Sequence, residues 1–379
     1  MKVWHVAGVT GSELESILAE PARRLRAGEV IAFPTETVYG LGANAWDETA
    51  VRKIFAAKGR PADNPLIVHI AHESDLDGVV ANPSTIPEPA RRLMKAFWPG
   101  PLTLILPAHE KLATAVHPGM DTVGVRMPDD PVAHSLIAAA GCPIAAPSAN
   151  SSGRPSPTTA DTVAHDLADR IDGLVDGGPC IVGLESTVAA VTDNEGIVYR
   201  PGWITPEELA EVAGVPFRLD PHLEGGGETP RSPGMKYRHY APDAKVSVWW
   251  GETEKVVEAV QEFSTATKQG DLTGGPDQGD HAGGADQGDH VTASGQGGPR
   301  LAIICPADFP VIEGVTERWS PGTDEPYETG LSRELYSRLR WADDVDADFV
   351  LIVGVPPKGH GLALMNRLQK ASEGRLFHV

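Results

Sequence analysis

The feature that most constrains the fold of this chain is an alternation of helical and strand patterns that occurs twice. In the first half, segments with helical spacing of apolar residues lie between short apolar runs typical of strands. The expected helices are 14–25, 47–57, 89–97 and 132–140, and the expected strands are 30–33, 66–70, 102–106, 122–127, 188–191 and 197–200. This order predicts a mixed α/β domain with one large sheet.

A break in composition separates this half from the rest. Residues 214–243 are dominated by Pro, Gly and charged residues, which is typical of an interdomain linker. A second alternation follows, with expected strands at 246–250, 301–304 and 349–353 and helices at 254–263, 331–341 and 362–371. The 379 residues therefore divide into a domain at 1–213, a linker at 214–243 and a smaller doubly wound domain at 244–379.

A stretch of biased composition interrupts the second domain at about 267–299. It is rich in Gly, Asp and Gln, and Asp-Gln-Gly-Asp-His occurs at 277–281 and again at 286–290. Such residues bury too little apolar surface to offset the entropy of ordering them, so we expect a disordered surface insertion. Weak metal binding by its Asp and His residues is an alternative.

Charge and cysteine content exclude several classes of protein. The chain has 32 Lys and Arg against 52 Asp and Glu, a net charge of −20. This argues against a large basic surface for nucleic acid or an anionic membrane, but not against a small anionic ligand in a local basic pocket. Cys142, Cys180 and Cys305 form no C-x-x-C pair, so neither a disulfide framework nor a zinc ribbon is favoured. Without an apolar signal core or a membrane-length apolar run, we expect a cytoplasmic protein.

Known catalytic motifs are few. Neither a Walker A sequence nor a G-x-S-x-G elbow is present. His69 and His72 form an H-x-x-H pair, which is typical of two unrelated histidines unless a third ligand joins them in a metal site.

Four polar clusters follow expected strands or helices, where α/β folds place their ligands. The cluster at 34–42 has two Thr hydroxyls and two glycines. The second carries Lys58 and Arg60 on a tight turn, followed by Asn64. The third, at 146–153, is rich in Ser and Asn, and the fourth is 185–188. Each alone is also typical of an ordinary polar turn or a solvated helix end.

Taken together, the clusters indicate a more specific site. Lys58, Arg60, Arg126 and Arg200 lie at element ends beside Ser/Thr loops, in a chain that is otherwise acidic. Lys supplies a point charge and Arg a forked donor, and both suit phosphate groups. We therefore expect a site for a polyanion of the nucleotide type.

The same residues resemble a known family. The sequences at 34–41, 58–61, 64–66, 147–150 and 185–188 are similar to the signature of the YrdC-like family, whose members are L-threonylcarbamoyladenylate synthases. The resemblance covers about 8–211. Residues 232–242 resemble the linker of the long, two-domain form, and 361–368 the end of its C-terminal domain. It implies a twisted mixed sheet in the N-terminal domain and a smaller Rossmann-like C-terminal domain.

The resemblance also implies a reaction. L-threonine, bicarbonate or CO2, and ATP with Mg²⁺ would give threonylcarbamoyl-AMP, pyrophosphate and water. The product would feed threonylcarbamoylation of adenosine in tRNA, completed by a separate transferase complex. Positioning and charge neutralisation dominate such chemistry, with Mg²⁺ held through the ATP phosphates. The acidic net charge argues against direct tRNA binding.

The same resemblance implies roles for individual residues. The residues implied to bind ATP are Lys58, Arg60, Asn64, Thr122, Ser148, Asn150, Ser156, Arg200 and Tyr240. Those implied to bind threonine are Thr37, His69, Arg126, Ala146 and Ser186, with Arg126 on the carboxylate. Lys58, Arg60, Ser148 and Asn150 would serve catalysis most directly, and His69 is a candidate general base. Tyr237, His239 and Tyr240 would form a lid that protects the adenylate from water; a passive tether is the alternative.

Two other functions remain as alternatives. The first is a non-catalytic RNA-binding factor, which would need a continuous basic stripe and an affinity that falls with salt. The second is another ATP-dependent carbamoyl transferase, which would ordinarily need zinc-binding or acylphosphatase-like segments that the sequence lacks.

Overall fold

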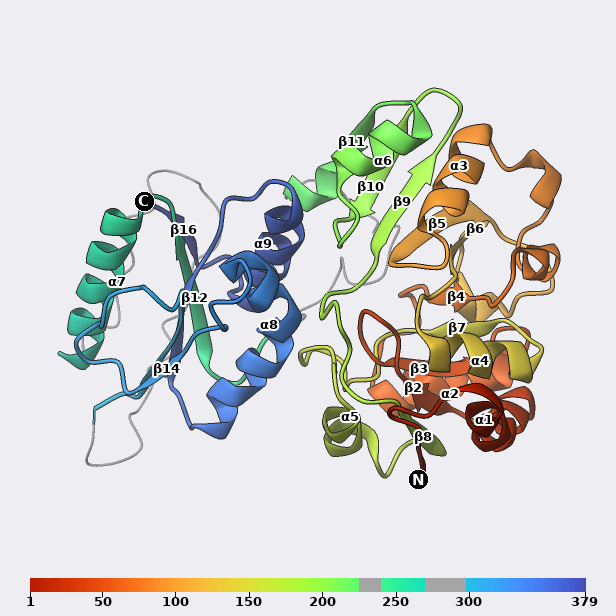
Figure 1. Ribbon diagram of the computed structural model, residues 1–379, viewed down its shortest axis with the longest axis horizontal. Coiled ribbons are helices and arrows are strands. Elements are labelled where there is room, and N and C mark those ends of the chain that lie inside the picture. The colour runs from red at the N-terminus through yellow and green to blue at the C-terminus, as the bar shows by residue number, and fades with distance from the viewer. Residues whose placement is uncertain (225–239, 270–297) are drawn as a thin grey trace.

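Two lobes, each built on its own sheet, make up the protein. The computed structural model describes residues 1–224, 240–269 and 298–379. The first sheet has eleven strands in the order β1-β8-β2-β3-β7-β4-β6-β5-β9-β10-β11, and the second has five in the order β14-β13-β15-β12-β16. Figure 1 shows the first lobe on the right, from red to green, and the second on the left, from teal to blue. The predicted fold class, mixed α/β followed by a smaller α/β domain, is confirmed.

The first lobe contains most of the secondary structure. Its strands are β1 (Lys2–His5), β2 (Ile31–Phe33), β3 (Gly40–Asn44), β4 (Ile67–His69), β5 (Leu102–Pro107), β6 (Thr122–Arg126), β7 (Ile144–Ala146), β8 (Gly173–Asp176), β9 (Thr187–Val191), β10 (Gly196–Arg200) and β11 (Phe217–Leu219). Its helices are α1 (Gly11–Arg26), α2 (Glu48–Lys58), α3 (Glu88–Phe97), α4 (Pro131–Ala140), α5 (Ala160–Leu167) and α6 (Pro206–Ala213). The 3₁₀ turns are η1 (Glu73–Gly78), η2 (Pro83–Thr85), η3 (Thr114–Val116) and η4 (Pro221–Glu224).

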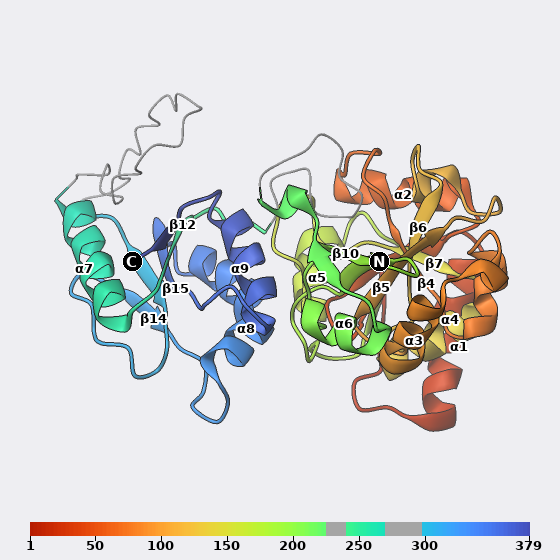
Figure 2. The same ribbon diagram turned by 90° about the horizontal axis from the view of Figure 1, so that it is seen from above.

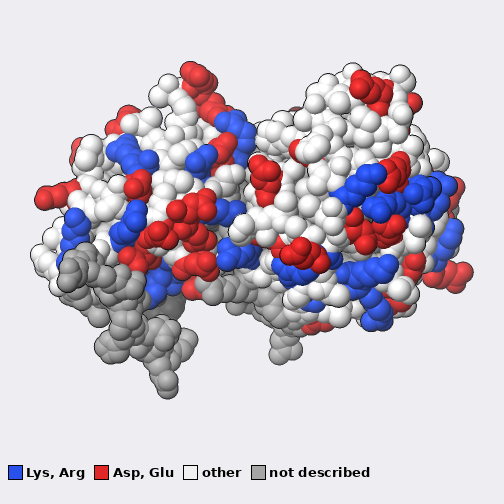
Figure 3. All heavy atoms as spheres, turned by 90° about the horizontal axis from the view of Figure 1, so that it is seen from below, with Lys and Arg blue, Asp and Glu red and all other residues white. Residues whose placement is uncertain are grey.

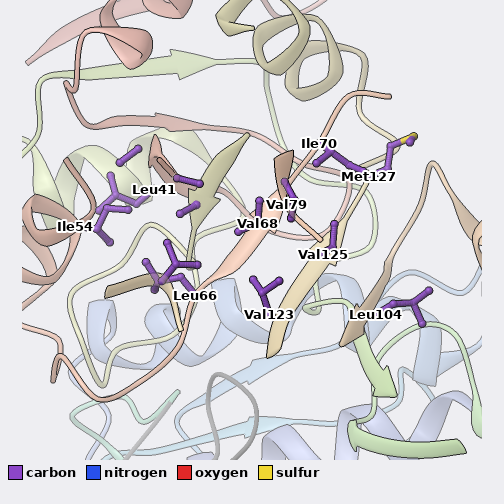
Figure 4. Packing of buried hydrophobic residues seen from close by; sticks show 14 of the residues in the cluster. Leu41, Ile54, Leu66, Val68, Ile70, Val79, Leu104, Val123, Val125 and Met127 are labelled. Carbon is purple, nitrogen blue, oxygen red and sulfur yellow. The ribbon is translucent and has the colours of Figure 1, made fainter. Parts of the chain in front are cut away.

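Helices cover both faces of the large sheet, because its side chains alternate in direction along each strand. Phe33 and Ile144 pack with α1 and α4 in one core cluster. Ala32 and Ala145, their neighbours in sequence, belong to the cluster on the opposite face, which includes α2 and α3. Figure 4 shows part of this second cluster, with Ile54 of α2 near residues of the sheet.

Local sequence signals fix the ends of α2, and these ends matter for the site. Asp47 caps its N-terminus, accepting from the backbone N–H of Thr49 at 2.9 Å and of Ala50 at 3.1 Å. Gly59 ends the helix with a φ of 63°, a left-handed conformation that glycine adopts at low cost. Lys58 therefore lies in the last turn of α2, just before the chain reverses towards Arg60.

The second lobe is a parallel sheet wound on both faces. Its strands are β12 (Lys245–Trp250), β13 (Leu301–Ile304), β14 (Glu317–Trp319), β15 (Phe349–Val353) and β16 (Leu376–His378), and its helices are α7 (Thr253–Lys268), α8 (Tyr327–Asp344) and α9 (His360–Ala371). Every strand pair is parallel. Trp249 packs against the α7 side and Val248 against the side of α8 and α9. This is the Rossmann-like arrangement that the resemblance implies.

Two boundaries differ from the sequence-based expectation. Residues 217–219 form β11, which pairs with β10, so the first sheet extends into the stretch predicted as linker. The helix α7 continues to Lys268 with Thr267 buried, so it runs beyond the predicted 254–263 and into the predicted insertion. In both cases tertiary packing extends an element that its sequence pattern marks only weakly. Most of the predicted linker and insertion, 225–239 and 270–297, lies outside the described residues.

The second lobe packs on α5 and on the loop after β10 of the first lobe, and Figure 2 shows α8 and α9 facing this side. Arg340 of α8 donates to both carboxylate oxygens of Asp166 at 2.9 Å. The ring of His360, at the start of α9, stacks on Trp203 with 4.6 Å between centroids. Helix α5 and the loop that follows β10 therefore contact the second lobe.

The structure also shows the state of the cysteines and the apolarity of the helices. Cys142, Cys180 and Cys305 are free thiols, and all three are buried. In the parts of the chain that the structure describes, no helix combines the length and apolarity needed to cross a bilayer.

Gly42 of β3 generates a stability prediction. A Cβ atom there would lie 2.7 Å from Phe33 Cε1 and 2.8 Å from Ile144 Cγ2, and both side chains are fully buried. We expect Gly42→Ala to lower the free energy of unfolding by about 1–3 kcal/mol through overpacking. Urea unfolding measures this. Gly322→Ala is the control, since a Cβ there meets nothing within 4 Å, and an equal loss in both variants would contradict the packing argument.

Candidate nucleotide and amino-acid site

Residues from widely separated segments line one cavity at the centre of the first sheet. Strand register explains part of this convergence: β4 and β6 run parallel with His69 opposite Arg126, and β7 places Ala146 opposite Ile67. The lining residues are Thr35, Thr37, Val38, Gly40, Arg60, Ile67, His69, Arg126, Ala146, Pro147, Ser148, Glu185, Ser186, Arg200 and Tyr240. All four polar clusters identified in the sequence contribute to this one site.

Arg126 is a buried cation held in one orientation. Its side chain is only 4% exposed, and its Nη2 lies 2.7 Å from Glu36 Oε1. Its Nη1 donates to Thr37 Oγ1 at 2.9 Å and its Nε to the Gly100 carbonyl at 3.3 Å. A guanidinium with fixed donors at a cavity wall suits a carboxylate or a phosphate.

His69 is neutral beside Arg126. Burial and the neighbouring guanidinium lower the pKa of its imidazole from 6.5 to about 3. Its Nδ1 is buried and has no hydrogen-bond partner among the described residues. At neutral pH the ring can therefore offer a cavity ligand a donor or an acceptor without adding charge.

Arg200 and Ser186 form a second polar group in the cavity. Arg200 donates from Nε and Nη2 to the Ser186 carbonyl at 3.1 and 2.9 Å, and from Nη2 to the Ser186 hydroxyl at 3.0 Å. The Ser186 hydroxyl also lies 2.8 Å from Thr103 Oγ1. The guanidinium is thus anchored to the strand β9 end that carries the fourth cluster.

Lys58 lies behind the cavity wall. Its Nζ donates to the carbonyls of Ser148 and Asn150, each at 2.5 Å, and to Asn150 Oδ1 at 3.3 Å. Burial, and then the charge of Arg60, hold the pKa of Lys58 well below its usual range. In this geometry the amine fixes the loop at 148–150, and Ser148 presents that loop to the cavity.

The remaining residues predicted for ATP divide into two groups. Arg60 and Tyr240 line the cavity, and Arg60 Nη2 donates to the Pro65 carbonyl at 3.1 Å. The others do not line it: Asn64, Asn150 and Ser156 are buried and Thr122 is half-buried. Of the lid residues, Tyr237 and His239 lie outside the described residues.

Sequence reasoning missed the role of two carboxylates. Glu36 pairs with Arg126, and Glu185 accepts from Ser156 Oγ at 2.6 Å and from Arg367 Nε at 2.9 Å. Burial alone would raise the pKa of Glu185, but Arg367 and Arg200 lower it to about 2, so it is ionised. Each of these acids is the single charged residue of its motif and lies next to a strand end. Because a buried carboxylate needs a cationic partner, this position could have indicated an ion pair with an arginine.

A metal held by protein side chains does not fit this donor set. Within residues 1–224, 240–269 and 298–379, no group of three or more His, Cys, Asp or Glu side chains is placed to hold a metal ion. Glu36 and Glu185 are both engaged by arginines. His72 caps η1 and its ring lies against that of His134, so it forms no cluster with His69.

Comparisons with known proteins agree along the chain. Residues 23–202 match the Sua5/YciO/YrdC family model, described as "Telomere recombination", and residues 204–373 match the model described as threonylcarbamoyl-AMP synthase, C-terminal domain. A Bacillus subtilis threonylcarbamoyl-AMP synthase is 44% identical over 361 residues, 95% of this chain and 94% of the relative. A Pyrococcus abyssi protein of the same name is 43% identical and covers 94% of each chain. The structure of P. abyssi Sua5 complexed with L-threonine superimposes with a TM-score of 0.85 at 40% identity, covering all of both chains.

The fold, the cavity and these matches define an α/β enzyme of the nucleotidyltransferase type. More specifically, the chain belongs to the threonylcarbamoyl-AMP synthase family, in its two-domain form.

His69 generates a prediction about acid sensitivity. Its pKa is about 3 in the folded protein and 6.5 unfolded, so the unfolded state binds a proton first as the pH falls. Stability is therefore lost from pH 6.5 downwards, by about 2 kcal/mol between pH 6.5 and 5. Urea unfolding at both pH values should show a smaller loss for His69→Gln.

Between pH 6.5 and 5, the contribution of His69 to stability changes while that of Glu185 does not. The pKa of Glu185 is lowered from 4.5 to about 2, so its contribution is lost only below pH 4.5. An unchanged difference between pH 6.5 and 5 in His69→Gln would contradict the assignment of a neutral, buried His69.

Proposed function

We propose that the cavity binds L-threonine and ATP side by side and forms threonylcarbamoyl-AMP for the modification of tRNA. The observation that carries the proposal is the distribution of charge in one cavity: Arg126 stands on one wall, and Arg60 and Arg200 supply separate cations. A chain with a net charge of −20 has gathered three guanidiniums at one place. An amino-acid carboxylate and a triphosphate are the two anions that this reaction must hold together.

Threonine occupies the Arg126 side in this proposal. Arg126 pairs with its carboxylate, while Thr37, Ser186 and the backbone at Ala146 contact its amine and hydroxyl. The neutral imidazole of His69 binds there without repelling an ammonium group. Support comes from the buried geometry of these residues and from the relative whose structure was solved with L-threonine.

ATP occupies the side of Arg60 and Arg200. Ser148 and Tyr240 line this part, and Lys58 holds the loop of Ser148 in place. Asn64, Thr122, Asn150 and Ser156 complete the nucleotide site as an outer layer. Of the four residues assigned to catalysis, Arg60 and Ser148 face the phosphates, and Lys58 and Asn150 support them by fixing the loop of Ser148; positioning and neutralisation of charge lower the barrier.

The chemistry then proceeds in two bond-forming steps. The neutral amine nitrogen of threonine attacks the carbon of bicarbonate or CO2 and gives a carbamate. Water is lost when bicarbonate is the donor, and a proton is released to solvent when CO2 is the donor. A carbamate oxygen then attacks the α-phosphorus of ATP. The bond between the α-phosphorus and the oxygen that bridges it to the β-phosphate breaks, and pyrophosphate leaves. The protein's part is to orient the three reactants and exclude water.

Mg²⁺ enters with ATP in this proposal and is held through the phosphates. The donor set supports this view, because the two carboxylates at the site are already engaged by arginines. Bound there, the ion would neutralise the charge of the departing pyrophosphate. The product would pass to a tRNA threonylcarbamoyl transferase in the cytoplasm. Acidic and basic side chains are interleaved on the face in Figure 3, which does not support direct tRNA binding there.

Pyrophosphate release tests the proposal. With ATP and Mg²⁺ present, release should require both L-threonine and bicarbonate, and mass spectrometry should find threonylcarbamoyl-AMP. Pyrophosphate release that does not depend on threonine would overturn the proposal, and so would the absence of release from folded protein. RNA binding without catalysis would then be the hypothesis to test.

Arg126 generates a prediction about substrate specificity. Lys keeps the charge but loses the forked donors that hold Glu36 and Thr37. We expect Arg126→Lys to raise the KM for threonine about tenfold or more, with the KM for ATP changed less than about threefold. Steady-state kinetics measures both. Equal increases would place Arg126 outside the threonine side.

A further inference from the structure

We infer that Arg367 of α9, in the second lobe, is a positioning residue for the nucleotide side of the cavity, acting through Glu185 and Tyr240. This inference rests on the proposed function and deepens it. It gives the second lobe a direct part in the synthase site, beyond joining the two lobes.

Glu185 is the link between the lobes. One oxygen, Oε1, accepts from Ser156 Oγ at 2.6 Å within the first lobe. The other, Oε2, accepts from Tyr336 Oη at 2.7 Å and from Arg367 Nε at 2.9 Å, both in the second lobe. Glu185 itself lines the cavity and precedes Ser186, which anchors Arg200.

Arg367 is completely buried, and its contacts belong to the interface. Besides Glu185, it donates from Nη1 to the Pro201 carbonyl at 2.8 Å and to Asn366 Oδ1 at 3.0 Å. Pro201 directly follows Arg200 at the end of β10. The guanidinium therefore fixes the chain on both sides of the Arg200–Ser186 pair.

The same two helices also hold Tyr240. The rings of Tyr240 and Tyr336 stack with 5.2 Å between centroids, and the Arg367 guanidinium lies 5.9 Å from the Tyr240 ring. Tyr240 has a φ of 66°, a left-handed conformation that is costly for a residue with a side chain. The stacking and cation–π contacts provide a reason for this conformation, which places Tyr240 against the cavity.

The positive charge of Arg367 indicates a role beyond holding the two lobes together. Asp166 and Arg340 already form a buried ion pair across the interface. A buried ion pair also adds little stability over a well-packed apolar pair. Glu185 with Arg200 alone would be neutral, whereas Arg367 leaves a net positive charge beside the proposed nucleotide. Arg367 should therefore favour ATP over a ligand with a single carboxylate.

Binding measurements on the full chain test the inference without turnover. Calorimetry with Mg²⁺ and the non-hydrolysable analogue AMP-PNP should give about tenfold weaker binding for Arg367→Met. L-threonine binding should weaken less than about threefold. Arg367→Lys should recover much of the loss. The control Arg333→Gln removes an α8 ion pair with Glu325 that does not reach the cavity, and should bind both ligands as the wild type does.

A double variant separates positioning from net charge. Glu185→Gln with Arg367→Met keeps the wild-type net charge of this group, now carried by Arg200 alone, but lacks the ion pair that joins the lobes, so AMP-PNP binding should stay weak. Recovery of AMP-PNP affinity in the double variant would overturn the inference, as would equal losses for both ligands. If Arg367→Met does not fold, Arg367→Gln keeps hydrogen-bond donors but removes the guanidinium charge; wild-type AMP-PNP binding in that variant would also overturn the inference.

The outcomes remain distinct from those of the proposed function. A wild-type chain that binds both ligands but releases no pyrophosphate would overturn the synthase proposal and leave the role of Arg367 standing. A wild-type chain that binds no AMP-PNP would overturn both.

Discussion

Burial of charge is the constraint on which the site depends. Arg126, Arg200 and Arg367 are all removed from water, and an unpaired buried guanidinium would be very unfavourable. Glu36 meets Arg126, and Glu185 lies between Arg200 and Arg367. Glu36 holds Arg126, Glu185 holds Arg367, and Ser186 holds Arg200, while Arg126 and Arg200 line the cavity. The rigidity of the site follows from this pairing, which the large sheet supports by bringing the strand ends together.

Much of this arrangement could be predicted from the sequence. The alternation of patterns predicted the order of most helices and strands. Strand ends rich in Arg, Ser and Thr indicated the cavity before any geometry was known. These predictions succeeded because they rest on local rules, namely periodicity and the preference of ligand sites for strand ends.

What the sequence could not give depends on distant partners. Strand β3 carries Gly40 and Gly42, which have low strand propensity, yet Phe33 and Ile144 leave room there only for glycine. The resemblance assigns Lys58 to ATP, but no pattern in the sequence shows that its amine donates to the carbonyls of Ser148 and Asn150. The pairing of Glu185 joins positions 182 residues apart, and no pattern in one sequence reveals such a contact.

That long separation has a consequence for how the protein is made. Chains fold from the N-terminus as they are synthesised, and the first lobe has all of its strands by Leu219. Arg367, however, lies in α9 and is translated well after Leu219. Until it emerges, Glu185 lacks its cation from the second lobe, and Tyr240 lacks the platform of α8 and α9. Maturation of the nucleotide pocket is thus tied to the synthesis of α8 and α9, so a translation product that stops before α9 would carry the large sheet but an unfinished pocket.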